Sequence, residues 1–136
     1  MEAIKGGKAG KSILVIDDDR FIQKMFALHF SRQGLRVLAA MDGQEGYELA
    51  LRHRPDLIVM DLMMPKMDGF ETTSMLRAHP TTRRIPIVAV TAKVPRPGQP
   101  RYEDFGFAGY CTKPFHLDDL DSLIRKHLGA RVDSAS

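Results

Sequence analysis

The stretch Leu57-Ile58-Val59-Met60-Asp61-Leu62-Met63-Met64-Pro65-Lys66-Met67-Asp68-Gly69 contains the pattern that decides the fold. Its opening apolar run, bounded by turn residues, is typical of a strand buried on both faces of a parallel sheet. Asp61 follows this run directly, where the predicted strand passes into a loop. Ligands of open α/β sheets bind just outside the carboxyl ends of the strands, so Asp61 is a candidate functional carboxylate. On this stretch alone, an acid that merely ends a strand and faces water is an equally good interpretation.

The composition excludes several classes of protein. The 136 residues are 43% hydrophobic and 27% charged, which fits one globular domain with its own core. No apolar run reaches the roughly 18 residues of a membrane-spanning helix, and no secretory signal precedes the first apolar run. The single cysteine, Cys111, excludes an internal disulfide and fits a reducing compartment, so we expect a cytoplasmic protein. A net charge of +3, spread over the chain, predicts neither direct DNA binding by this domain nor membrane association.

Strand patterns and helix patterns alternate along the chain. The apolar runs that predict strands cover residues 12–16, 36–40, 57–60, 85–90 and 109–112. The patterns that predict helices cover residues 22–30, the segment from the Asp42-Gly43 turn to Pro55, 69–79 and 117–128. This alternation predicts an α/β fold of three layers, in which helices cover both faces of a five-stranded parallel sheet. We divide the chain into a flexible lead-in (1–11), a domain (12–128) and a flexible tail (129–136).

The segment between the fourth and fifth predicted strands departs from this pattern. A fourth helix is expected there, but the segment contains Pro95, Pro97, Gly98 and Pro100. Each interior proline costs a helix roughly 3 kcal/mol, so we expect the fourth helix to be short or disrupted, with at most a turn over 101–105. Fixed proline rings lower the entropy cost of ordering a loop on a partner, and we interpret the segment as a partner surface. A tolerated loop insertion is the alternative.

Polar residues at the predicted strand ends form a second pattern. Asp17 and Asp18 follow the first strand, Asp61 the third, Thr91 the fourth and Lys113 the fifth. A parallel sheet brings these ends to one edge, where carboxylates, a hydroxyl and an ammonium group converge. Carboxylate oxygens suit Mg²⁺ (or Mn²⁺), which offsets the repulsion among the acids. Asp61, a single acid on a central strand, can then attack phosphorus and become an aspartyl phosphate, while Lys113 and Thr91 contact the phosphoryl oxygens.

Four segments carry a resemblance to a known family. They are Ile13-Leu14-Val15-Ile16-Asp17-Asp18, Asp61-Leu62-Met63-Met64-Pro65-Lys66-Met67-Asp68-Gly69, Val90-Thr91-Ala92 and Gly109-Tyr110-Cys111-Thr112-Lys113-Pro114-Phe115. In this order and at this spacing, they resemble the receiver domain of response regulators in two-component signalling. The resemblance covers roughly residues 12–128. It implies a flavodoxin-like fold with strand order 2-1-3-4-5, in a signalling domain rather than an enzyme.

The resemblance also implies roles for individual residues. Asp61 is expected to accept a phosphoryl group from a histidine kinase or a histidine phosphotransfer protein. Asp18, Asp61 and the backbone carbonyl of Met63 are expected to bind Mg²⁺, with Asp17 acting through water. Thr91 and Tyr110 match the pair of residues that switches a protein-interaction surface after phosphorylation.

Two further positions concern the lifetime of the phosphate. Met63 and Lys93 match positions that tune dephosphorylation, and a bulky Met63 beside a cationic Lys93 predicts a persistent phosphate. The prolines of the disrupted fourth helix put the family's usual dimer surface and the usual output through Tyr110 in doubt. The extra acid Asp19 matches no assigned role, and we interpret it as a surface acid or as an acid at a helix N-terminus.

Other functions fit the sequence less well. A scaffold on the same fold that works without phosphorylation would be favoured by a missing acid or lysine, and none is missing. A phosphatase with an aspartate nucleophile would use Asp17-x-Asp19, but Phe21 stands where its motif has Thr or Val. A flavin carrier would need a phosphate-binding loop after the first strand. Gly10-Lys11-Ser12 ends like a P-loop, but Lys5 stands at the position of the first glycine, and a strand rather than a helix follows.

Overall fold

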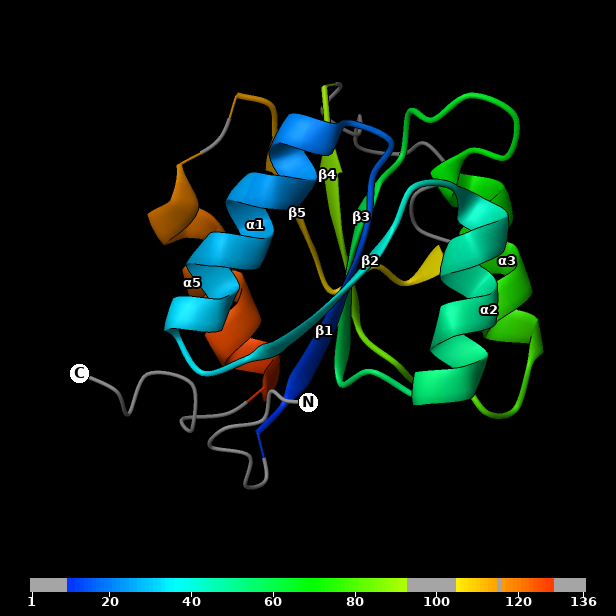
Figure 1. Cartoon of the computed structure of the whole chain (residues 1–136). Helices are drawn as coiled ribbons and strands as arrows, with labels where there is room; N and C mark the ends of the chain where they lie inside the picture. Colours follow the sequence, from blue (N-terminus) through cyan, green and yellow to red (C-terminus); the bar gives the residue numbers. More distant parts are fainter. Residues whose placement is uncertain (1–9, 93–104, 115, 129–136) are drawn as a thin grey trace.

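The structure of the chain is a computed structural model that describes residues 10–92, 105–114 and 116–128. These residues form a parallel sheet of five strands in the order β2-β1-β3-β4-β5, which confirms the predicted architecture and strand order (Figure 1). The strands are β1 (Ser12–Ile16), β2 (Arg36–Ala40), β3 (Leu57–Asp61), β4 (Ile87–Thr91) and β5 (Gly109–Thr112). The helices among the described residues are α1 (Arg20–Arg32), α2 (Gly43–His53), α3 (Gly69–Ala78) and α5 (Leu117–Leu128).

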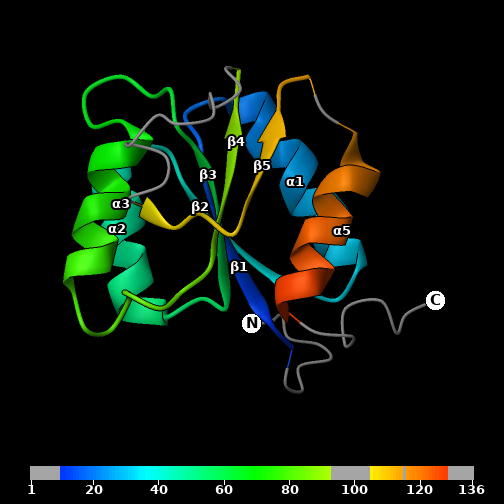
Figure 2. The ribbon, with the colours of Figure 1, turned by 180° about the vertical axis from the view of Figure 1, so that it is seen from behind.

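Two helices cover each face of the sheet. Helices α1 and α5 lie on one face and α2 and α3 on the other, and the two opposite views agree on this arrangement (Figures 1 and 2). Alternation along β1 sends Ile13 and Val15 to the α1 and α5 side, and Leu14 and Ile16 to the other side. Because both faces are covered, the central strands β1, β3 and β4 are buried at every position, and this is why the sequence shows continuous apolar runs there.

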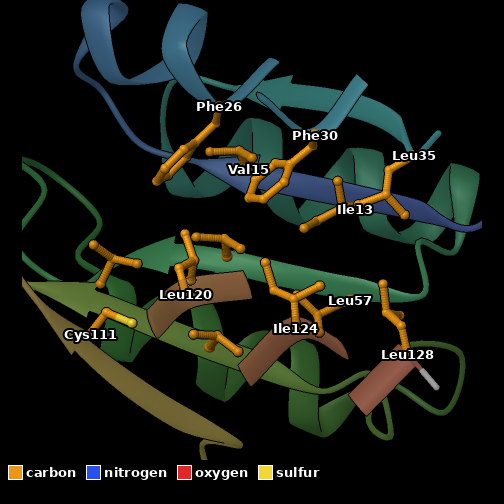
Figure 3. Close-up of a cluster of buried hydrophobic side chains, with 13 residues drawn as sticks. Ile13, Val15, Phe26, Phe30, Leu35, Leu57, Cys111, Leu120, Ile124 and Leu128 are labelled. Carbon is orange, nitrogen blue, oxygen red and sulfur yellow. The ribbon is translucent and has the colours of Figure 1, made fainter. Parts of the chain in front are cut away.

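The core between the sheet and helices α1 and α5 is formed by apolar side chains on the facing sides of the two helices. Phe26 and Phe30 of α1 point toward Ile124 and Leu128 of α5 across the strand residues (Figure 3). The rings of Phe26 and Phe30 lie 5.3 Å apart in a tilted arrangement. This packing holds α1 against the sheet, and therefore fixes the loop that joins β1 to α1.

Aspartates begin three of the helices. The side chain of Asp19 accepts hydrogen bonds from the N–H groups of Phe21 and Ile22, at 2.8 and 3.2 Å. This N-cap confirms Asp19 as an acid at a helix N-terminus. Asp42 caps α2 and Asp68 caps α3 in the same way, the latter in a capping box with Glu71. Asp42-Gly43, which the sequence predicted as a turn, is instead the start of α2.

Several predicted boundaries are wrong by one or two residues. Strand β3 ends at Asp61 rather than at residue 60, β4 ends at Thr91 rather than at residue 90, and α1 spans Arg20–Arg32 rather than 22–30. Strand β4 begins at Ile87 rather than at residue 85, because the Ile85 N–H turns back to the Thr82 carbonyl at 3.1 Å. Pro86 has no N–H to donate to a ladder, although its carbonyl accepts from the Ile58 N–H at 2.9 Å. Helix α3 ends at Ala78, with His79 as its extended C-cap.

Some predictions lie outside the described residues. These are the disrupted fourth helix, apart from a single helical residue at Phe105, and the assignments of residues 1–9, 93–104 and 129–136. None of the helices in the described ranges is long and apolar enough to cross a membrane.

Candidate functional site

Three carboxylates meet at the carboxyl edge of the sheet. Asp17, Asp18 and Asp61 each offer an oxygen, and these oxygens all lie within 4.8 Å of one another. Asp17 and Asp61 are buried, whereas Asp18 is exposed. The cluster is therefore buried where Asp17 and Asp61 leave the sheet, and solvent reaches it at Asp18. The three acids that the sequence predicted to converge at this edge do so.

Lys113 lies against two of these acids. Its Nζ is 3.2 Å from Asp61 Oδ2 and 3.4 Å from Asp17 Oδ2. Strand alternation explains the meeting: Asp17, Asp61 and Lys113 continue the rows of Val15, Val59 and Cys111, which face α1 and α5. The Lys113 N–H also donates to the Thr91 carbonyl at 2.9 Å, which carries the β4–β5 pairing one residue further. The peptide between Lys113 and Pro114 is cis.

Charge and burial oppose each other at this edge. Burial raises the pKa of Asp17, and the neighbouring Asp61 raises it further, against the opposing effects of the Asp19 N–H and the Lys113 ammonium group. For Lys113, burial alone would lower the pKa, but the carboxylates of Asp17 and Asp61 outweigh it and raise the pKa above its ordinary value. Negative charge is therefore in excess in this cluster.

Backbone groups orient the two buried acids. Asp17 Oδ1 accepts from the Asp19 N–H at 2.9 Å, and Asp61 Oδ1 accepts from the Met63 N–H at 3.0 Å. A side chain on Gly69 would place its Cβ 2.8 Å from the Asp61 carbonyl oxygen and 2.7 Å from the Leu62 Cα. Only glycine therefore lets α3 begin directly against the backbone of Asp61 and Leu62.

The two predicted switch residues lie on the neighbouring strands β4 and β5. Thr91 is fully buried at the end of β4, one residue beyond Val90, which pairs with Asp61 in the sheet. Tyr110 of β5 is 36% exposed, and its ring lies edge-on to the ring of Phe107 at 5.6 Å.

A run of aromatic rings in tilted and edge-on contact continues from Tyr110 to helix α3. Phe107 lies 5.9 Å from Phe105, and Phe105 lies 5.3 Å from Phe70, the second residue of α3. Arg77 of α3 supports the same segment, since its guanidinium group donates to the carbonyls of Phe105 and Ile85 at 3.2 and 2.8 Å. Burial lowers the pKa of Arg77. Sequence reasoning missed the contacts of Phe105 with Phe70 and with Arg77, because these residues are 35 and 28 positions apart in the sequence.

Sequence reasoning also missed two buried polar contacts. Gln23 of α1 donates to three backbone carbonyls near the acids. Its spacing from Phe26 and Phe30 places it on the buried stripe of α1, and a polar residue on that stripe was the available signal. His29 of α1 lies with its Nε2 2.9 Å from Asp121 Oδ1 of α5. No sequence pattern predicts that pairing.

The acid cluster fits a hard divalent cation. Three carboxylates face one ammonium group, which leaves an excess of two formal negative charges in a largely buried place. Oxygen-only donors with an open, solvated side are what Mg²⁺ takes in proteins.

Removing the carboxylate of Asp17 is expected to stabilise the cation-free protein at neutral pH. Because the folded-state pKa of Asp17 is raised above 3.8, the folded protein binds more protons than the unfolded chain between these two values. The stability contributed by Asp17 is therefore present at low pH and is lost as pH rises through its folded-state pKa. Asp17→Asn avoids that loss, with a gain of about 1 kcal/mol at pH 7.

Urea unfolding in EDTA between pH 3.5 and 7.5 measures this effect. The stability of Asp17→Asn relative to wild type should increase with pH. Asp42→Asn, at an exposed N-cap where asparagine caps equally well, controls for the substitution itself. A difference between Asp17→Asn and wild type that stays constant or shrinks with pH would contradict the prediction.

Known proteins resemble this chain over most of its length. The family model described as response regulator receiver domain matches residues 13–125. The polar-differentiation response regulator DivK of Brucella anthropi is 32% identical over 119 residues, which cover 88% of this chain and 97% of that protein. The DNA-binding dual master transcriptional regulator RpaA of Synechocystis is 37% identical over 113 residues, which cover 83% of this chain and 47% of that protein. The chain therefore spans about half the length of RpaA.

Solved structures show the same fold. The Vibrio cholerae chemotaxis protein CheY4 superposes with a TM-score of 0.82 at 28% identity, covering 88% of this chain and 99% of that one. The receiver domain of the Pseudomonas aeruginosa sensor histidine kinase PA1611, solved with a magnesium ion coordinated in its active site cleft, gives a TM-score of 0.80 at 31% identity, covering 90% of this chain and 100% of that one. The chain therefore belongs to the response regulator receiver domain family, the phosphoacceptor domains of two-component signalling.

Proposed function

We propose that Asp61 is the phosphoacceptor of this receiver domain. The observation that carries the assignment is its place: it ends the central strand β3, and its Oδ2 lies 3.2 Å from Lys113 Nζ. Asp17 and Asp18 are adjacent on one loop after β1, an arrangement suited to holding a cation from one side. Asp61 reaches this cation-binding position from the neighbouring strand. It can therefore accept the phosphoryl group while Asp17 and Asp18 continue to hold the cation.

The donor is a phosphohistidine of a histidine kinase or of a histidine phosphotransfer protein. A carboxylate oxygen of Asp61 attacks phosphorus, a P–O bond forms, the P–N bond breaks, and the leaving imidazole takes up a proton. Lys113 then pairs its ammonium group with a phosphoryl oxygen, and the Thr91 hydroxyl donates to another. The protein assists its own modification in this way, but it acts as a signalling domain, and the aspartyl phosphate is the signal.

Mg²⁺ (or Mn²⁺) is the cofactor of this reaction in our proposal. Asp18, Asp61 and the Met63 carbonyl would hold the ion, with Asp17 acting through water. When bound, the cation supplies positive charge that offsets the carboxylates and the phosphoryl oxygens. The magnesium ion in the receiver domain of PA1611 supports this choice.

Phosphate at Asp61 would bias the surface around Thr91 and Tyr110. The edge-on ring contacts from Tyr110 through Phe107 to Phe70 join that segment to the start of α3, close to the loop that follows Asp61. We further propose that the receiver domain spans residues 12–128, between a lead-in (1–11) and a tail (129–136), and that it works in the cytoplasm. The family match over residues 13–125 supports these limits.

Intact mass spectrometry after incubation with acetyl phosphate tests the proposal. The wild-type protein should gain one phosphate with Mg²⁺ present and none in EDTA. If a phosphohistidine donor also fails to phosphorylate it while Mg²⁺ binds, the proposal is wrong, and a scaffold that works without phosphorylation takes its place.

A further inference from the structure

We propose that Gln23 is a positioning residue for the cation-binding acids, because its buried carboxamide holds the peptide group that joins Asp17 to Asp18. This inference rests on the proposed function of the acid cluster. It assigns no chemistry to Gln23 itself. Gln23 is 7% exposed and lies in the first turn of α1, where its N–H donates to the Asp19 carbonyl at 3.0 Å.

The carboxamide of Gln23 reaches three carbonyls, one on β1, one on β2 and one in the loop after β1. Its Nε2 lies 2.9 Å from the Asp17 oxygen, 2.8 Å from the Ala40 oxygen and 3.1 Å from the Val15 oxygen. An amide group has two N–H donors, so one of them is shared between two carbonyls. The Asp17 carbonyl is part of the peptide between Asp17 and Asp18. Gln23 thus ties that peptide to the ends of β1 and β2.

The other end of the same side chain supports a positioning role. Gln23 Oε1 is buried and has no hydrogen-bond partner among the described residues. A buried acceptor without a partner costs free energy, and the bonds that Nε2 donates to the carbonyls offset that cost. The Ala40 carbonyl is already bound by the Asp17 N–H at 3.0 Å, so the strand pairing does not require Gln23. The hydrogen bond that the Gln23 amide donates to the Asp17 carbonyl fixes the position of that carbonyl.

The position of Asp18 depends on this peptide. Asp18 follows this peptide directly, and its carboxylate oxygen lies within 4.8 Å of oxygens of Asp17 and Asp61. Without the Gln23 bond, the peptide can rotate, and the oxygens of Asp17 and Asp18 no longer point to a common centre. Supporting groups of this kind typically change metal affinity by 10- to 100-fold when they are removed.

Two substitutions of Gln23 test the proposal against a matched control. Gln23→Met keeps length and volume but removes the donors, and Gln23→Glu keeps shape but turns an acceptor toward the carbonyls. Thr82→Val is the control, because Thr82 Oγ1 is also buried and donates to a backbone carbonyl, that of Leu76 at 2.7 Å, in the turn before β4 and away from the acids. All three should lower thermal stability in EDTA.

Only the Gln23 variants should change the response to Mg²⁺. Calorimetric titration should give a dissociation constant for Mg²⁺ that is roughly tenfold higher than that of wild type. The Mg²⁺ concentration for half-maximal phosphorylation by acetyl phosphate should rise by the same factor, while the rate at saturating Mg²⁺ stays within about twofold. Unchanged Mg²⁺ affinity in both Gln23 variants would overturn the proposal.

A measurement on the wild-type protein applies even if a variant fails to fold. In amide NMR spectra, the side-chain NH₂ signals of Gln23 should shift on addition of Mg²⁺, whereas those of Gln33, which donates to Asp121 at 3.1 Å, should not. Gln23 signals that stay in place at saturating Mg²⁺ would also overturn it. The titrations measure Mg²⁺ binding separately from phosphorylation. If the protein binds Mg²⁺ with an affinity that depends on Gln23 but takes no phosphate, the proposed role of Asp61 is wrong and that of Gln23 stands.

Discussion

Asp61→Asn is expected to abolish phosphorylation by acetyl phosphate and by a phosphohistidine donor. An amide lacks the charged oxygen that attacks phosphorus, and no other side chain of the cluster takes its place. The fold should survive, because the oxygen of the substituted side chain can still accept the Met63 N–H, as Asp61 does at 3.0 Å. Intact mass spectrometry at saturating Mg²⁺ should show one added phosphate for wild type and none for the variant.

Asp68→Asn is the control for this experiment. Asp68 lies on the same loop, but it serves as the N-cap of α3, a position where asparagine and aspartate perform equally. This variant should take phosphate as wild type does. If Asp61→Asn gains a phosphate at the wild-type rate, the acceptor is a different residue. If Asp17→Asn alone loses the label, a phosphatase-like use of the first acid becomes the better interpretation.

Lys113→Met is expected to slow phosphorylation by about 100-fold at saturating Mg²⁺, the usual scale for removing one group that stabilises developing negative charge. Lys113 Nζ touches both Asp61 and Asp17, so the substitution leaves two buried carboxylates without their cation. The pKa of Lys113 is raised above 10.5, so its contribution to stability is fully present below that pH and is lost only as pH rises through the folded-state value. Lys113→Met should therefore also lower stability at neutral pH.

Lys66→Met gives the same change of charge at an exposed position of the β3–α3 loop. Its phosphorylation rate should stay within about twofold of wild type, as expected for a surface substitution. Rates are compared by initial phosphate incorporation at matched Mg²⁺ and donor concentrations. A Lys113→Met protein that is folded and phosphorylated as fast as Lys66→Met would show that the ammonium group has no part in the transfer.

Much of the fold and of the acid cluster could be predicted from the sequence. Parallel strands leave their carboxyl ends at one edge, so the residue after each apolar run can be placed there without knowledge of side-chain packing. This reasoning located Asp17, Asp18, Asp61 and Lys113, and the structure brings the four together. The strand limits were less certain where turn chemistry decides them, as with Ile85 and Pro86 before β4.

Supporting contacts could not be predicted in the same way. The bonds of Gln23 to Ala40 and of Arg77 to Phe105 join residues that meet only after the sheet and its helices have packed. Periodicity tells which face of a helix is buried, but it does not tell which carbonyl a buried amide or guanidinium group will find. The persistent phosphate predicted from Met63 and Lys93 stays a prediction: the Met63 side chain is exposed beside the acids, and Lys93 lies outside the described residues.

The most direct test of the account is to locate the phosphate on the chain. Sodium borohydride reduces an aspartyl phosphate to homoserine with release of phosphate, and peptide mass spectrometry then identifies the reduced residue. After phosphorylation of the wild-type protein with Mg²⁺ and acetyl phosphate, homoserine should appear at position 61 and at no other aspartate. Homoserine at position 17 or 18, or phosphate that resists borohydride and maps to a hydroxyl side chain, would contradict the assignment of Asp61 as the phosphoacceptor.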